Sequence, residues 1–183
     1  MSNSHPNLRG FSIDGSERGG SRTNQFIGAF KKAKESGLGI TAHAGESSGP
    51  QGVVAALDQL GVDRLDHGVR AVEDPALMSR LAAEGIPLNV CVSSNCHNLY
   101  SSYDQHPLPQ LLAKGLICTI NTDDPAMLDI NLSSELVAVA DAYDLSLGDL
   151  KQLQLNATMA AFWTLEVKAQ LGEQIENEWS SIT

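Results

Sequence analysis

Histidines and carboxylates recur at three points of the 183-residue sequence, each at the end of a short apolar run. His43 and Glu46 end one run, His67 ends the next, and Asp123 and Asp124 end the last. Imidazole nitrogen and carboxylate oxygen are ligands of catalytic zinc, which keeps one coordination position open for water. Zinc lowers the pKa of such a water to about 7. These residue types therefore fit metal-assisted hydrolysis with a carboxyl group as the acid.

Each cluster also has a purely structural interpretation. Glu46 could complement a helix dipole, His67 could be a turn histidine, and the polar residues 93–95 could form a turn. Asp124 could cap a helix that begins at Pro125. Two adjacent acids after a buried strand are harder to explain, because a buried charge needs a partner. The matched positions of all the clusters favour a functional site.

The clusters alternate with segments that read as strands and amphipathic helices. Strands are expected at 10–14, 38–42, 64–69, 86–92 and 116–121, the fourth apolar enough to be buried on both faces. Such alternation predicts a parallel sheet with right-handed crossovers. The carboxyl ends of parallel strands meet at one edge, so the polar clusters should converge there.

The helices follow from apolar spacing and from capping residues. Between the strands we expect helices over 23–36, 50–60, 75–84 and 107–114, the third capped by Asp74. After Asp124 we expect no further strand. We expect helices over 133–143, 147–155 and 158–175, with a frayed tail over 176–183.

Composition excludes several classes of partner. The net charge of −10 and the pI near 4.8 argue against binding to nucleic acid or to an anionic membrane surface. No apolar run approaches 18 residues, and residues 1–9 are polar, so we expect neither a signal peptide nor a membrane span. Three cysteines, an odd number, favour reduced thiols and a cytoplasmic location.

Four motifs in this order resemble the adenosine and adenine deaminase family: HAGE at 43–46, DHGVR at 66–70, SSN at 93–95 and NTDDP at 121–125. The resemblance extends from about residue 10 to about residue 174. It implies an α/β fold of the (β/α)8 TIM-barrel type with one Zn²⁺. About five C-terminal strands would be present, followed by C-terminal helices, so that residues 1–183 form a single partial barrel domain.

The resemblance assigns a role to each residue that matches a motif. His43 and Asp123 match two zinc ligands of the family. Glu46 matches the glutamate that protonates the purine ring nitrogen. His67 matches the histidine that orients or assists the zinc-activated water.

Two further residues match the part of the family's site that contacts the substrate. Asp124 matches a residue that contacts the purine edge and the water, which makes it both catalytic and substrate-binding. Gly15 lies near the glycine whose backbone touches the base, although the family more often has AGDE or DSSE where this chain has DGSE at 14–17. A further departure is Cys91-Val92 where the family often has Cys-Pro.

The largest departure concerns the zinc ligands. The family carries a His-x-His pair on its first strand, whereas His5 is followed by Pro6 and Asn7, and His97 and His106 follow no strand end. We therefore expect the N-terminal strands of the barrel to be missing. A sequence of this length is also short of the roughly 250 residues of a complete barrel. A half-barrel has two open edges, so we expect a fragment of a longer protein or self-association through those edges.

The implied activity is hydrolytic deamination of adenosine or deoxyadenosine to inosine. The segments HAGESSGP at 43–50 and LSSE at 132–135 favour adenosine over adenine, and adenine or another 6-aminopurine is the alternative substrate. A different metal-dependent hydrolase is less favoured, because Glu46 follows His43 at the deaminase spacing. An alternative of another class is a non-catalytic half-barrel that acts as a binding or interaction module. Retention of Glu46, His67 and both aspartates argues against it.

Overall fold

The computed structural model describes residues 7–17 and 23–181. Its strands form one sheet in the order β1-β2-β3-β4-β5, and each neighbouring pair is parallel. The strands are β1 (Gly10–Phe11), β2 (Gly39–Ala44), β3 (Arg64–His67), β4 (Leu88–Val90) and β5 (Cys118–Ile120). The five predicted parallel strands are confirmed, although most are shorter than expected.

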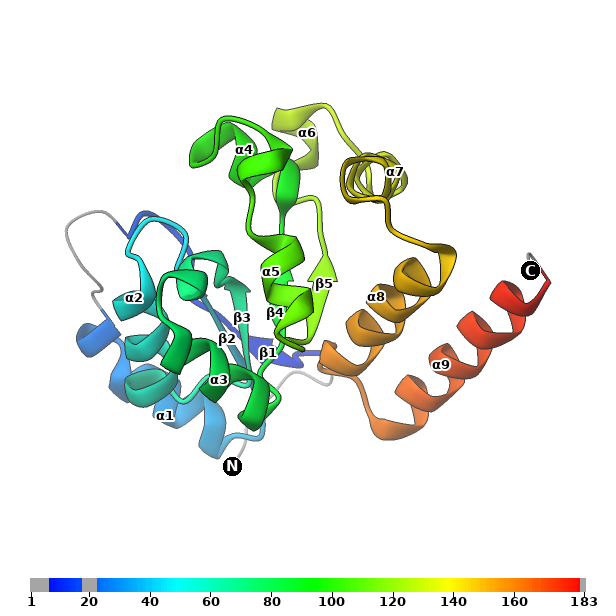
Figure 1. Cartoon of the computed structure of the whole chain (residues 1–183). Helices are drawn as coiled ribbons and strands as arrows, with labels where there is room; N and C mark the ends of the chain where they lie inside the picture. The colour runs from blue at the N-terminus through cyan, green and yellow to red at the C-terminus, as the bar shows by residue number, and fades with distance from the viewer. Residues whose placement is uncertain (1–6, 18–22, 182–183) are drawn as a thin grey trace.

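Helices follow each of the strands and continue beyond the last one (Figure 1). Those between the strands are α1 (Ile27–Glu35), α2 (Pro50–Ala55) with its continuation η2 (Ala56–Leu60), α3 (Pro75–Glu84), α4 (Val92–Asn98) and α5 (Leu108–Ala113). After β5 come α6 (Pro125–Leu128), α7 (Leu132–Tyr143), α8 (Leu147–Ala160) and α9 (Leu165–Ser180). Short 3₁₀ turns are η1 (Thr23–Gln25), η3 (Val69–Glu73) and η4 (Tyr103–Gln105).

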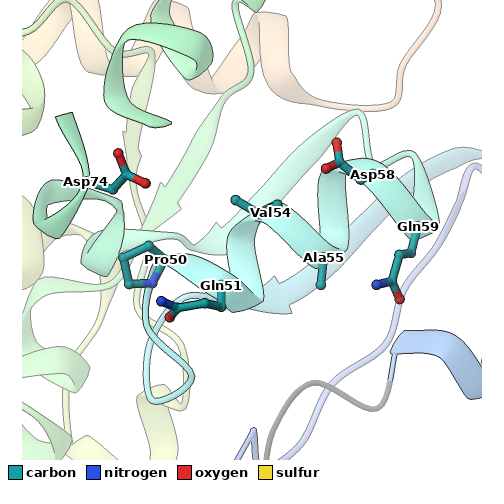
Figure 2. Close-up of a pocket in the computed structure, with 7 residues that line it drawn as sticks. All are labelled: Pro50, Gln51, Val54, Ala55, Asp58, Gln59 and Asp74. Carbon is teal, nitrogen blue, oxygen red and sulfur yellow. The ribbon is translucent and has the colours of Figure 1, made fainter. Parts of the chain in front are cut away.

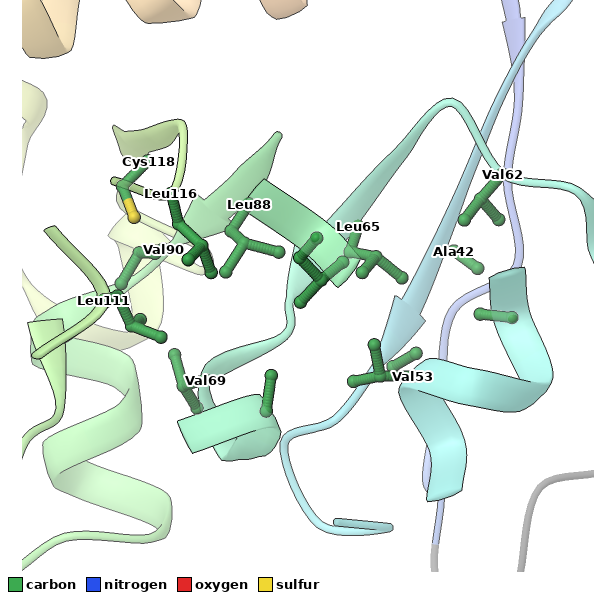
Figure 3. Close-up of a cluster of buried hydrophobic side chains, with 14 of the residues drawn as sticks. Ala42, Val53, Val62, Leu65, Val69, Leu88, Val90, Leu111, Leu116 and Cys118 are labelled. Atoms are coloured by element: carbon green, nitrogen blue, oxygen red, sulfur yellow. The ribbon is translucent and has the colours of Figure 1, made fainter. Parts of the chain in front are cut away.

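One face of the sheet carries the apolar core. Alternate strand residues such as Ala42, Leu65 and Leu88 are almost completely buried on this face, against side chains from α2, η3 and α5 (Figure 3). Because successive side chains of a strand point to opposite faces, the residues between them must face the other way. Helices α2 and α5 and the turn η3 therefore cover the apolar face.

The opposite face carries a ladder of polar side chains. Thr41 donates to Asp66 at 2.9 Å, Asn89 donates to the other oxygen of Asp66 at 2.7 Å, and Thr119 donates to Asn89 at 3.0 Å. The expectation that the fourth strand is buried on both faces is wrong, because Asn89 is half-buried and lines a cleft. The polar face is thus stabilised by side-chain hydrogen bonds across the strands.

The amino end of the sheet is closed by the segment between α8 and α9. The Phe162 ring packs so closely on Gly10 and Gly39 that a Cβ atom on either glycine would overlap it. The guanidinium of Arg64 lies 4.1 Å from the centroid of that ring and donates to the carbonyl of Ala160 at 3.0 Å. This packing joins the end of α8 to the first three strands.

Two sequence predictions about the helices are wrong, and one structural alternative does not hold. The predicted break near residue 156 is absent, because Asn156 stays helical and donates to the carbonyl of Cys118 in β5 at 2.9 Å. The break comes at 161–164, where Thr164 caps α9. The tail predicted to fray from 176 is helical up to Ser180. The residues 93–95, considered as turn formers, lie in α4.

His5 lies outside the described residues. Among the described helices, none combines the length and the apolar character needed to cross a membrane.

Candidate active site

The structure brings together four side chains at the carboxyl end of the sheet. His43 lies in β2, His67 is the last residue of β3, Glu46 follows β2, and Asp123 follows β5. His67 and Asp123 border a cleft of about 690 Å³, and Glu46 borders an adjoining hollow of about 290 Å³. His43 and Asp123 line both spaces, so the two hollows meet at these residues.

His43 is surrounded by carboxylates. Its Nδ1 lies 3.3 Å from Asp14 Oδ1, and its Nε2 lies 3.7 Å from Glu17 Oε2 and 3.6 Å from Glu46 Oε2. The side chain of His43 is 16% exposed, so part of it faces the cleft. The two ring nitrogens are thus both within reach of negative charge.

His67 lies between Glu46 and Asp123. Its Nδ1 is 3.8 Å from Glu46 Oε1, and its Nε2 is 3.7 Å from Asp123 Oδ2. The two histidine rings, His43 and His67, approach edge to face with centroids 4.5 Å apart. Asp123 is held by the hydroxyl of Ser94, which donates to Oδ2 at 2.7 Å. These contacts link residues at the carboxyl ends of β2, β3, β4 and β5.

A buried carboxylate that sequence analysis overlooked, Glu17, holds the turn that carries Glu46. It accepts hydrogen bonds from the backbone N–H groups of residues 45–48 at 2.7–3.2 Å and from the hydroxyl of Ser48. Burial alone would raise the pKa of Glu17, but the Ser48 hydroxyl and the backbone N–H groups of the turn hold that pKa below its usual value. The glutamate of the sequence DGSE therefore fixes the HAGE turn.

A second buried carboxylate, Glu135 of α7, holds the start of α4. Its oxygens accept from the backbone N–H of Ser93 at 2.9 Å and from the Ser93 hydroxyl, which also contacts the Tyr103 hydroxyl at 2.6 Å. A carboxylate at a helix N-terminus is favoured by the helix dipole. The helix that carries Ser94 and Asn95 is positioned in this way.

Asn95 and His106 form a buried polar chain behind the site. The amide nitrogen of Asn95 donates to Glu46 Oε1 at 2.9 Å and lies 3.1 Å from His67 Nδ1. Its oxygen lies 3.2 Å from His106 Nε2. Sequence analysis placed Asn95 within a motif and gave His106 no role. The available signal for His106 was a histidine directly before a proline that begins a helix.

The two predicted substrate-contacting residues lie at the rim. Gly15 and Asp124 border the smaller hollow with Glu46, and neither lines the larger cleft. Gly15 has φ of 110°, a conformation that favours glycine, and its N–H donates to Asp14 Oδ1 at 2.6 Å. Asp124 precedes α6 but makes no capping hydrogen bond with its side chain. Its carboxylate is therefore not engaged in capping the helix.

The donor set at the cleft suits a metal ion in part. Within the described residues, two groups could hold one: His43 with Glu46 and His67, and His67 with Cys91 and Asp123. The predicted ligands His43 and Asp123 fall in different groups, with His67 common to both. Burial, and then the charge of Asp123, raises the pKa of the Cys91 thiol well above its usual range. A neutral thiol is a poor ligand, so the imidazole and carboxylate groups are the better donors.

Another hollow, along the outer face of α2, carries no comparable chemistry (Figure 2). Its two acids have structural partners, because Asp58 pairs with Arg80 at 2.8 Å and Asp74 caps α3 through two backbone N–H groups. The titratable groups of this surface are therefore accounted for by the fold.

Comparison with known proteins gives a consistent result. The family model for adenosine deaminase matches residues 4–178. An adenosine deaminase from Klebsiella pneumoniae (strain 342) is 40% identical over 151 residues, which are 82% of this chain and 45% of the relative. An adenine deaminase from Chelativorans sp. (strain BNC1) is 40% identical over 168 residues, 91% of this chain and 51% of the relative. The chain thus spans about half the length of the curated relatives it matches.

Solved structures agree with the sequence relatives. The adenine deaminase from Arthrobacter aurescens is 34% identical with a TM-score of 0.89, over 94% of this chain and 52% of that one. An amidohydrolase from Burkholderia ambifaria with bound zinc is 29% identical with a TM-score of 0.90, over 98% of this chain and 50% of that one. The expected α/β fold of the barrel type is confirmed for about half of such a structure.

Proposed function

We propose that this chain, which belongs to the adenosine deaminase family, contributes His43, Glu46, His67 and Asp123 to a site that deaminates adenosine or deoxyadenosine to inosine by hydrolysis. The observation that carries the proposal is the convergence of these side chains at the carboxyl end of the sheet, where His67 lies within 4 Å of both acids. Parallel α/β folds carry their active sites at this end.

His43 and Asp123 would serve as ligands of Zn²⁺. They line the same cleft, their donor atoms are of the types that catalytic zinc prefers, and a relative of the same fold has been solved with zinc. Within the described part of the chain, no lysine or arginine forms an ion pair with the carboxylates around His43, so a cation is favoured there. When bound, zinc would supply an activated water at neutral pH.

Glu46 would donate the proton that the purine ring nitrogen receives. Its Oε1 accepts a hydrogen bond from Asn95, which leaves Oε2 on the side of His43 and the hollow. His67 would orient the attacking water from its Nε2, the nitrogen on the side of Asp123. At the rim, Asp124 and the backbone of Gly15 would contact the purine.

Adenine, or another 6-aminopurine, is the second candidate substrate. The adenine deaminase relative matches a longer part of this chain than the adenosine deaminase relative, 168 against 151 residues at the same identity. The ribose of a nucleoside needs additional room and polar partners, so the ratio of kcat/KM for adenosine and for adenine decides between them.

The test is turnover of adenosine and adenine by the purified chain with zinc, followed by ammonia release. The same assay is repeated after adding a polypeptide that covers the half of the Klebsiella pneumoniae relative that this chain does not match. We expect adenosine turnover in the combined sample. If neither purine is converted in either sample, the deaminase proposal is wrong and the non-catalytic binding module takes its place.

Three further expectations rest on the same proposal. Residues 1–183 would form one partial barrel domain, with β1 and β5 as its edge strands. Exposed edges favour pairing with other strands, and self-association through them stays a prediction. A cytoplasmic location also stays a prediction.

A further inference from the structure

We propose that His106 is a positioning residue that decides, through the amide of Asn95, which ring nitrogen of His67 carries the proton. The inference deepens the proposed function and rests on it, because that function gives His67 its part in the reaction. His106 borders neither of the hollows at the strand ends, so it would act only through Asn95.

The protonation of His106 is settled by its own surroundings. The backbone N–H of Leu108 donates to Nδ1 at 3.1 Å, so Nδ1 bears the lone pair. The residue is 3% exposed, and burial lowers the pKa of His106 to about 4. The ring is therefore neutral at pH 7 and carries its hydrogen on Nε2. That N–H donates to Asn95 Oδ1 at 3.2 Å.

The orientation of the Asn95 amide follows from its partners. Its oxygen accepts from His106, so its nitrogen faces Glu46 Oε1 at 2.9 Å and His67 Nδ1 at 3.1 Å. The reversed amide would set its oxygen against a carboxylate and its NH₂ group against an N–H donor. Asn95 is fully buried, so water cannot replace the lost partners, and unsatisfied buried polar groups are costly.

The last group in this series of hydrogen bonds is the ring of His67, and its tautomer follows from the contact with Asn95. An amide N–H that points at Nδ1 requires a lone pair there, so the ring hydrogen of His67 lies on Nε2. Nε2 lies 3.7 Å from Asp123 Oδ2, on the side of the cleft. The same amide also holds Glu46. One buried histidine thus orients both the proposed acid and the histidine that would hold the water.

Packing alone does not account for His106. Its ring meets Tyr100 edge to face at 5.1 Å, a contact that a phenylalanine ring would also make. What phenylalanine lacks is the pair of polar contacts, with Leu108 N–H on one side and Asn95 on the other. His106→Phe therefore removes the relay and keeps the ring.

The test reads the tautomer directly. In ¹⁵N-labelled chain, imidazole NMR spectra distinguish a protonated ring nitrogen from a bare one, and His67→Gln assigns the signals. We expect the Nε2–H form of His67 in the wild type and in His106→Gln, whose amide can still donate to Asn95. In His106→Phe, Glu46 alone orients the amide, so we expect a second, Nδ1–H population.

Asn95→Asp should give the largest change. A carboxylate oxygen facing Nδ1 of His67 favours a hydrogen on that nitrogen, so we expect the Nδ1–H form to dominate. The exposed His97, changed to Phe, is the matched control and should leave the His67 signals unchanged. An unchanged Nε2–H form in His106→Phe overturns the proposal, as does an Nδ1–H wild type. If the Phe variant does not fold, His106→Leu, which also lacks the donor to Asn95, is read in its place. No turnover is needed, so failure of the deaminase proposal is seen separately.

Discussion

The two ends of the same five strands are built on opposite principles. At the amino end, Phe162 packs on two glycines, and Arg64 donates to a backbone carbonyl and lies over the ring. At the carboxyl end, two imidazoles lie among four carboxylates from three segments, namely Asp14 and Glu17 after β1, Glu46 after β2 and Asp123 after β5. Packing of the Phe162 ring characterises the amino end, and a concentration of charged groups characterises the carboxyl end. Changes at the first should alter stability, and changes at the second should alter chemistry.

The largest effect expected is on turnover. Glu46→Gln removes the proposed acid, and general acid catalysis contributes roughly 10²–10⁴-fold. We expect kcat to fall by about 10³-fold in whichever sample of the complementation assay is active, with the melting temperature unchanged. Glu35→Gln, at an exposed position of α1, is the matched control. If Glu46→Gln retained its activity, the carboxyl end could no longer be described as the end whose residues carry out the chemistry.

At the amino end the largest expected effect is on folding. Phe162→Ala opens space beside Gly10 and Gly39, and such truncations cost about 3 kcal/mol. Urea unfolding measures the loss. The neighbouring Trp163 is 53% exposed, and Trp163→Ala should cost less than about 0.5 kcal/mol. Equal losses for the two variants would mean that Phe162 does not close the sheet.

Glu17 tests whether the carboxyl end also contains purely supporting groups. Glu17→Gln replaces an acceptor with an amide that faces N–H donors, which should cost about 2 kcal/mol at pH 7. The folded pKa lies below the usual 4.5, so the contribution is present above that value and is lost as pH falls through the folded pKa. The stability difference between wild type and variant should therefore shrink below pH 4.5.

Unfolding curves at several pH values measure this effect, with Glu178→Gln at an exposed site as the control. A difference that does not depend on pH would mean that the charge of Glu17 does not hold the turn.

The smallest expected effect is the stabilisation by metal. With zinc at ten times its dissociation constant, a binding site raises stability by about 1.4 kcal/mol. His43→Ala should abolish the zinc-dependent rise in melting temperature, and His97→Ala, at an exposed position, should keep it. If His43→Ala still responds to zinc, the ion binds elsewhere.

The two ends also differ in how far sequence could predict them. Alternation of apolar runs and amphipathic segments predicted all five strands, because that periodicity is local. Clusters at the strand ends identified His43, Glu46 and Asp123. Their supports depend on contacts between residues far apart in the chain, such as Glu17 with the turn after β2, and no local pattern marks those.

The same reasoning applies to the helix boundaries. Asn156 and Ala157 offered a plausible end to a helix, but the hydrogen bond from Asn156 to β5 keeps the segment helical. The break that does occur is the segment whose Phe162 packs on the amino end of the sheet. A tertiary contact, in both places, overrides the local preference.

His67 and Asp123 have left-handed backbone conformations, with φ of 68° and 58°. A left-handed conformation costs a residue with a side chain roughly 1 kcal/mol or more in free energy, whereas glycine adopts it at almost no cost. A library of variants selected only for folding should therefore drift toward glycine or asparagine at 67 and 123, and should keep glycine at 39. Selection for turnover should reverse the first result and leave the second unchanged. Comparing the sequences from the two selections would then distinguish residues that are retained for catalysis from residues that are retained for packing.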